Sequence, residues 1–94
     1  EVRQDIAISI VMHLDLRWAG RSDDVKDTVD YKKTKKAVME HVENTRFQLI
    51  ERIAEDVAAI CLKDEKVDVV DVKVDKLGAL RYADSVCVEV SRSR

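Results

Sequence analysis

Hydrophobic and polar residues alternate strictly near the beginning of the chain. Within residues 5–16, every even position from Ile6 onward carries an aliphatic side chain or methionine, whereas the odd positions include serine, histidine and aspartate. A repeat of two residues is the period of a strand with one buried face. The pattern therefore predicts a long, half-buried strand over residues 5–16.

Two later segments change to a spacing of three and four residues, the period of a helix with one apolar side. Asp30 can accept a hydrogen bond from a free backbone N–H group and so begin a helix over residues 31–44. A second helix is predicted over residues 47–62, and its broader apolar side should make it the more buried of the two. The expected inner residues of the first helix are Thr34, Ala37, Val38, His41 and Val42.

Polar segments separate these elements and lead to two further strands. Residues 19–28 should form a loop, in which Ser22-Asp23-Asp24 can cap a brief helical turn. After a charged turn at 63–66, valines indicate a strand over residues 67–74. Its alternation slips before Val70, which predicts a bulge or a strand start there. A loop over 76–84 then precedes a last strand over 85–90. This order is typical of an α+β domain, with a mainly antiparallel sheet and both helices on one face.

Composition limits the classes of function. The chain has 94 residues, 46% of them hydrophobic and 4% aromatic, so residues 1–94 should form one domain with a thin aliphatic core. Oligomerisation would support such a core. The net charge is -2, and the lysines at 32, 33, 35 and 36 form the one marked cluster of a single sign, so nucleic-acid binding is not favoured. Charges interrupt every apolar stretch, which disfavours a membrane span.

Two cysteines sit among aliphatic residues. Cys61 and Cys87 lack the paired spacing of a metal or redox motif. We expect both to be small buried side chains of a soluble protein in the reducing cytoplasm, and neither to act as a nucleophile.

Three polar residues stand in distinctive local settings. Tyr31 lies in Val29-Asp30-Tyr31-Lys32, Glu51 in Arg46-Phe47-Gln48-Leu49-Ile50-Glu51-Arg52, and Lys76 in Asp75-Lys76-Leu77-Gly78-Ala79-Leu80. Taken singly, each has an ordinary structural interpretation: a tyrosine at a helix start, a surface glutamate in an ion pair, and a solvated turn lysine. Together, in this order and spacing, the segments resemble the dihydroneopterin aldolase family, which includes the dihydroneopterin triphosphate 2′-epimerase. The resemblance covers about residues 3–91.

The resemblance implies a particular fold and assembly. The family has the tunnelling fold, with elements in the order β-β-α-α-β-β, and its sheets join around a ring of subunits into one barrel. The family's first strand, and a glutamate that contacts the substrate, would lie upstream of Glu1. A homo-oligomer, an octamer of two tetrameric rings with sites between subunits, is the implied assembly.

The resemblance also implies a reaction of folate biosynthesis, the retro-aldol cleavage of 7,8-dihydroneopterin. The dihydropterin ring accepts the electrons of the broken bond, so neither a metal nor a cofactor is needed. Glu51, beside Ile50, would bind the pterin by accepting two parallel N–H donors. Lys76 would remove the proton of the 2′-hydroxyl through a water. Tyr31 would come from the neighbouring subunit, help to bind the pterin and protonate the enol intermediate. Val29 and Ile50 would also bind the substrate. Aldolases usually have proline where this chain has Leu77.

Three alternatives compete with the aldolase. The segment Leu80-Arg81-Tyr82-Ala83-Asp84-Ser85-Val86 resembles the epimerase, whose triphosphate substrate requires basic residues such as Arg81 or the lysine cluster. Zinc-dependent pterin chemistry is disfavoured, because the only histidines are His13, expected on a strand surface, and His41, expected on a helix face. A noncatalytic scaffold would not need Tyr31, Glu51 and Lys76 together. We favour the aldolase.

Overall fold

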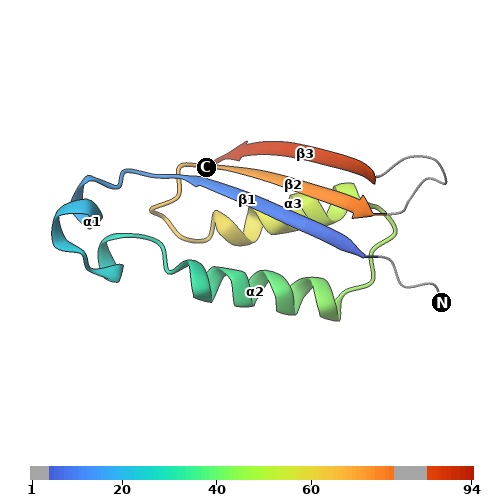
Figure 1. The fold of residues 1–94 in the computed structure, drawn as a ribbon, viewed down its shortest axis with the longest axis horizontal. Helices are drawn as coiled ribbons and strands as arrows, with labels where there is room; N and C mark the ends of the chain where they lie inside the picture. The colour runs from blue at the N-terminus through green and yellow to red at the C-terminus, as the bar shows by residue number, and fades with distance from the viewer. Residues whose placement is uncertain (1–4, 78–84) are drawn as a thin grey trace.

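The computed structural model of the chain describes residues 5–77 and 85–94. Three strands form one antiparallel sheet in the order β1-β2-β3, and the helices lie between β1 and β2 in the sequence (Figure 1). The α+β class predicted from the sequence is confirmed. The elements are β1 (Ile6–His13), α1 (Arg17–Ser22), the 3₁₀ helix η1 (Val25–Asp27), α2 (Tyr31–Asn44), α3 (Ile50–Cys61), β2 (Val69–Leu77) and β3 (Ser85–Ser93).

The sheet register is continuous. β1 pairs with β2 from Ile6 opposite Lys76 to His13 opposite Val69, and every residue between them has its partner. The expected bulge at Val70 is therefore wrong, and the slip in the pattern marks a strand start one residue earlier, at Val69. Val67 is buried ahead of the strand, in a turn where its N–H donates to the Asp64 carbonyl oxygen at 3.0 Å. Its apolar side chain therefore lies outside the alternation of β2.

One face of the sheet and both long helices form the core. Val70, Val72 and Val74 of β2 are fully buried beneath α3, which packs on β2 and β3. α2 packs on α3 and buries only Val38, so the prediction that the second helix is the more buried is confirmed. Ala37, expected on the inner side of α2, is exposed instead. The buried residues of α3 are Ile53, Ala54, Val57, Ala58 and Cys61.

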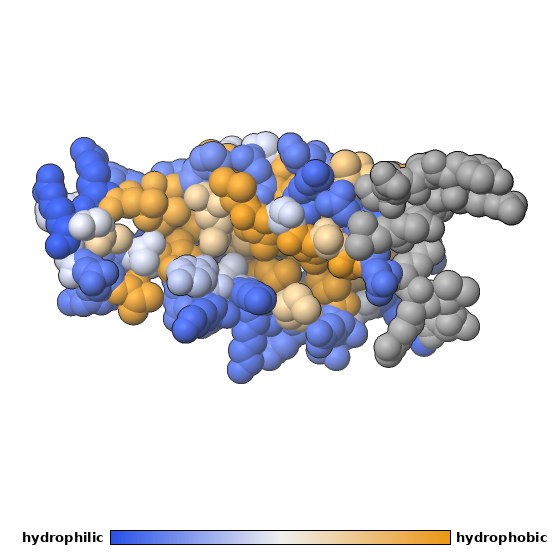
Figure 2. Space-filling model, viewed as in Figure 1, coloured by the Kyte–Doolittle hydropathy of each residue, from blue (hydrophilic) through white to orange (hydrophobic). Residues whose placement is uncertain are grey.

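The edge strand β1 is only partly covered. Its even-numbered residues are half-buried and its odd-numbered residues are exposed, which confirms the predicted alternation. Figure 2 shows apolar side chains along the middle of the face that β1 and α2 border. Because α2 packs on α3, the apolar side of β1 stays partly open.

The two long helices begin by different means. Asp30 accepts a hydrogen bond from the Lys33 N–H at 3.2 Å, and α2 has the bounds and the cap that the sequence predicts. α3 begins at Ile50, three residues later than expected, because Leu49 still has an extended backbone. Phe47 packs against the core from the connecting loop.

The segment between β1 and α2 is more ordered than predicted. β1 ends at His13, and the Asp15 carboxylate accepts a hydrogen bond from the Arg17 N–H at 3.0 Å as α1 begins. The strand therefore stops three residues short of the expected end. A brief capped turn was expected here, and Asp24 does cap η1 by accepting from the Lys26 N–H at 3.0 Å. α1 itself was not predicted.

The two cysteines differ in burial. Cys61 is buried in α3, and this burial raises the pKa of its thiol. Cys87 is exposed, so the expectation that both are buried is wrong for this residue. Strand alternation explains the difference, since Val88 and Val90 pack on the core and Cys87 points to the other face of β3. β3 is longer than predicted and ends at Ser93.

The molecule is elongated, with principal extents of 49 × 24 × 22 Å. β1, β2, β3, α2 and α3 all run roughly along its long axis (Figure 1). Residues at the ends of different strands and helices therefore lie near one another at each end of the molecule. Within residues 5–77 and 85–94, no helix is long and apolar enough to cross a membrane.

Candidate functional site

Lys76 is the next-to-last residue of β2, opposite Ile6 of β1 and Val86 of β3. The sequence pattern placed Lys76 in a loop after the strand, and this prediction is wrong. Even positions of β2 face the helices, as the full burial of Val72 and Val74 shows, and alternation puts Lys76 on the same face. Its side chain is half-buried at the end of the core. The strand thus directs the amine toward the helical layer.

Glu51 is the second residue of α3, in the first turn of that helix, as predicted. It is exposed, and the positive end of the helix dipole favours its negative charge. Ile50 packs partly against the core and thereby fixes the position at which the helix begins. One helical turn after Glu51, Glu55 accepts hydrogen bonds from Arg92 of β3 at 2.7 and 2.8 Å. The side of α3 that carries Glu51 therefore faces β3.

Glu51 and Lys76 lie at the same end of the molecule. α3 begins and β2 ends at one end of the long axis (Figure 1), and α3 packs directly on β2. Among the described residues, neither the Glu51 carboxylate nor the Lys76 amine has a hydrogen-bond or ion-pair partner. This corner of the fold therefore offers a carboxylate acceptor and an amine donor to a ligand.

Tyr31 is the first residue of α2, which begins far from the start of α3 along the long axis (Figure 1). Tyr31 is 69% exposed to solvent. The 14 residues of α2 run along the molecule for about 21 Å, so the helix itself separates Tyr31 from the corner with Glu51. One chain therefore does not bring Tyr31 together with Glu51 and Lys76.

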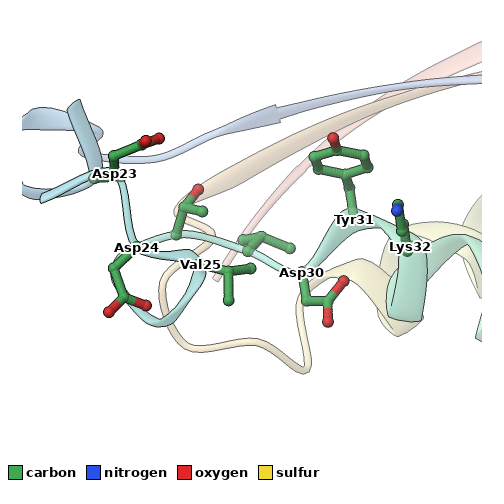
Figure 3. Close-up of a pocket in the computed structure, with 9 residues that line it drawn as sticks. Asp23, Asp24, Val25, Asp30, Tyr31 and Lys32 are labelled. Carbon is green, nitrogen blue, oxygen red and sulfur yellow. The ribbon is translucent and has the colours of Figure 1, made fainter.

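Tyr31 borders a hollow of about 450 Å³ that extends from α1 to the start of α2. Figure 3 shows Tyr31 and Lys32 pointing to one side of this segment and Asp24 and Asp30 to the other. The two aspartates cap η1 and α2. Val29 also lines the hollow, but it is only 4% exposed.

A polar contact between the helices joins α2 to α3. His41 Nε2 lies 2.9 Å from Asp56 Oδ2, and Arg52 Nε donates to Asp56 Oδ1 at 3.0 Å. The hydrogen bond with His41, ahead of the one with Arg52, holds the pKa of the Asp56 carboxyl below its ordinary value. The edge of the His41 ring contacts Phe47, with centroids 5.8 Å apart. Asp56 was not singled out in the sequence, although it lies on the polar border of the apolar side of α3.

The histidines are far apart in the fold. His13 is an exposed residue of β1, as expected, with Nε2 2.8 Å from Asp71 Oδ2. His41 lies on a helix face, as expected, and is half-buried against α3. In the described parts of the chain, no three histidine, cysteine or acidic side chains are grouped so that they could hold a metal ion. Residues 78–84, which include Gly78 and Arg81, lie outside the described residues.

Comparison with known proteins identifies the family to which the chain is similar. The family model described as FolB, dihydroneopterin aldolase, matches residues 1–91. The dihydroneopterin triphosphate 2′-epimerase of Escherichia coli strain K12 is 41% identical over 92 residues, which cover 98% of this chain and 77% of the epimerase.

Two solved structures are also similar. Escherichia coli dihydroneopterin aldolase in complex with neopterin has a TM-score of 0.91 at 38% identity, over 98% of this chain and 80% of that chain. A dihydroneopterin aldolase from Burkholderia thailendensis bound to guanine has a TM-score of 0.85 at 28% identity, over 97% and 76%. The sequence match and the shared fold agree, and the chain belongs to the dihydroneopterin aldolase family.

Proposed function

We propose that the protein cleaves 7,8-dihydroneopterin into 6-hydroxymethyl-7,8-dihydropterin and glycolaldehyde, without a metal or an organic cofactor. One observation carries the proposal: in a chain of this family, the Glu51 carboxylate and the half-buried Lys76 amine lie at one end of the core, and neither is paired within residues 5–77 and 85–94. Neither group supports the hydrophobic core, so a role toward a ligand accounts for both.

Glu51 is the proposed anchor of the pterin ring. The solved relatives are bound to neopterin and to guanine, two molecules that share a 2-amino-pyrimidinone edge. This edge carries two parallel N–H donors, and a carboxylate accepts such a pair through both oxygens. The first turn of α3 stabilises the carboxylate in its charged form. Ile50 holds this turn on the core and places its own backbone at the border of the site.

Lys76 is the proposed proton-transfer group. In its neutral form the amine removes the proton of the 2′-hydroxyl, directly or through a water, and the C2′–O bond becomes the carbonyl of glycolaldehyde. The C1′–C2′ bond breaks, and its electron pair forms a C1′=C6 double bond while the C6=N5 electrons move to N5, which gains a proton. Protonation of C1′, with loss of the proton on N5, then restores C6=N5 and gives the product. Atoms and charge balance without an added electrophile.

Tyr31 is proposed to protonate the enol intermediate in the site of a neighbouring subunit. The separation of Tyr31 from Glu51 along the long axis supports this assignment, because a site with all three groups requires two chains. The backbone of Val29 would border the same half of the site. A ring of subunits, and an octamer of two tetrameric rings, is the assembly that we propose.

Epimerisation of dihydroneopterin triphosphate at C2′ is the second candidate. The epimerase relative is 41% identical to this chain, against 38% for the aldolase bound to neopterin. Both reactions share the deprotonation and the bond cleavage. The epimerase then turns the bound aldehyde and re-forms the bond on its opposite face, so the same three residues serve either outcome.

Product analysis distinguishes the two candidates. The purified protein is incubated separately with 7,8-dihydroneopterin and with its triphosphate, without added metal, and the products are separated by chromatography. Release of glycolaldehyde from the unphosphorylated substrate is the expected result. Epimerised triphosphate with little cleavage would favour the second candidate. No turnover of either substrate would contradict both and leave a noncatalytic scaffold.

A further inference from the structure

His41 contacts the chain on both sides of Glu51. Before Glu51 in the sequence, the His41 ring edge meets Phe47 at a centroid distance of 5.8 Å and an interplanar angle of 66°. After Glu51, His41 Nε2 lies 2.9 Å from Asp56 Oδ2. His41 of α2 therefore contacts residues on both sides of the turn that carries Glu51.

The residues that directly precede α3 are only partly covered by the core. α2 buries only Val38, and Leu49, which directly precedes α3, is 59% exposed and provides no side-chain cap. Phe47 and Ile50 are only partly buried. α3 itself is anchored on β2 and β3 through buried side chains such as Ile53 and Ala54. The contacts of His41 add to this packing, because they fix α2 against the first turns of α3.

The contact is also chemically strong. Asp56 is charged and its side chain is 21% exposed, whereas that of His41 is 36% exposed. Hydrogen bonds to charged groups are stronger than those between neutral groups, and partial burial protects this bond from water. Arg52, which donates to the other oxygen of Asp56, keeps the carboxylate oriented toward α2.

We infer that His41 is a positioning residue for the pterin site: through Phe47 and Asp56 it holds the turn of Glu51 in the orientation that binds the 2-amino-pyrimidinone edge. The inference rests on the proposed function, because it assigns Glu51 to the pterin. His41 itself does not touch the substrate. Its loss should therefore weaken binding through Glu51 and leave the proton-transfer step at Lys76 nearly unchanged.

Binding of neopterin to the full-length protein tests the inference. In His41→Ala, we expect the Kd for neopterin and the KM for the substrate to rise about tenfold, since a small misplacement of a binding group has an effect of this order. The kcat should stay within about threefold of the parent protein. His41→Gln retains an N–H donor for Asp56 and should recover part of the loss.

The decisive comparison repeats the substitution in a Glu51→Gln background. If His41 acts through Glu51, the change at His41 should alter the Kd there by less than about twofold. An equal effect in both backgrounds would overturn the inference, because it would indicate a general structural role. If His41→Ala does not fold, His41→Gln and His41→Phe are compared in both backgrounds in the same way.

His13 provides the matched control. It also lies within hydrogen-bond distance of an aspartate, at 2.8 Å from Asp71, but on β1 and away from α3. His13→Ala should leave the Kd for neopterin unchanged, and an equal loss in both alanine variants would contradict the inference. Failure of the parent protein to bind neopterin would instead contradict the proposed function, so the two failures are distinguishable.

Discussion

Tyr31 and Glu51 lie in the first turns of α2 and α3, two helices that begin far apart along the long axis of the molecule (Figure 1). Each is near the start of a long helix, and α2 and α3 run in opposite directions, so their first turns cannot meet within one chain. A stacked arrangement of chains can bring the first turn of α2 from one subunit to the first turn of α3 in another. A site that uses both residues, as we propose, therefore requires at least two chains.

The charge of Glu51 should determine pterin affinity. Glu51→Gln keeps the size of the side chain but replaces one of two acceptor oxygens with a donor, which opposes the N–H groups of the ring. We expect the Kd for neopterin, measured by calorimetry, to rise by about 100-fold, because one hydrogen bond is lost and the other no longer involves a charged acceptor. Thermal unfolding should be nearly unchanged, since Glu51 is exposed and has no partner in the described residues.

Glu55→Gln is the control for this substitution. Glu55 lies one turn later on α3 and forms an exposed ion pair with Arg92. Its loss should have little effect on affinity or stability. A similar loss of affinity in both variants would argue against Glu51 as the anchor.

The ability of Lys76 to act as a base should determine the rate of cleavage. Lys76→Arg preserves the positive charge, but a guanidinium does not act as a base near neutral pH. We expect kcat, from steady-state assays with 7,8-dihydroneopterin, to fall by at least about 100-fold. Neopterin affinity should change by less than about threefold, because Glu51 is intact.

Lys73 lies on the same strand but on the exposed, opposite face. Lys73→Arg should therefore retain full activity. If Lys76→Arg is also fully active, the assignment of proton transfer to Lys76 is incorrect.

Asp56 should stabilise the fold at neutral pH and not in acid. Its pKa is lowered below 3.8, first by the hydrogen bond with His41, so the folded state favours the charged carboxylate. This stabilisation is present above the pKa of the unfolded chain and is lost as the pH falls through the lower folded value. Urea unfolding at pH 7 should show Asp56→Asn less stable than the parent by about 1 kcal/mol, and the difference should disappear near pH 2.

Asp15 is the comparison for Asp56: its pKa is also lowered, but this should contribute less to the free energy of unfolding. Arg17 lowers the pKa of Asp15 to about 2, mainly through side-chain hydrogen bonds. The pair is exposed and its members are two residues apart, so the unfolded chain can form much the same contact. Asp15→Asn should leave the unfolding free energy nearly unchanged at both pH values. A larger effect at Asp15 than at Asp56 would contradict this explanation.

The sequence predicted the elements wherever local chemistry determines them. The alternation from Ile6 to Met12 gave β1, and Asp30 gave the start of α2, because both signals lie within a few residues of the structure they determine. α3 begins later than its apolar pattern because Phe47 packs on the core without being helical. Periodicity placed Lys76 in a loop because the valine alternation ends at Val74. The strand continues through Lys76 because this residue pairs with Ile6 of β1 and Val86 of β3, and a single sequence does not reveal that pairing.

The candidate site was predicted mainly from the resemblance to the dihydroneopterin aldolase family, and less from the pattern of residues along the chain. Position in the first turn of a helix could be inferred for Glu51, but its proximity to Lys76 depends on how α3 packs on β2. The buried side chain of Val29 and the contact between His41 and Asp56 depend on the same packing. Such contacts join residues that are distant in the sequence, and periodicity alone does not identify them.

Mixed oligomers test the central claim most directly. Tyr31→Phe and Glu51→Gln, each alone, should be nearly inactive with 7,8-dihydroneopterin. When the two variants are co-expressed in equal amounts and the mixed oligomers are isolated through different affinity tags, about one quarter of the sites should combine an intact Tyr31 with an intact Glu51. The account predicts recovery of activity to about that fraction of the parent protein. Mixed oligomers no more active than the separate variants would contradict a site shared between subunits.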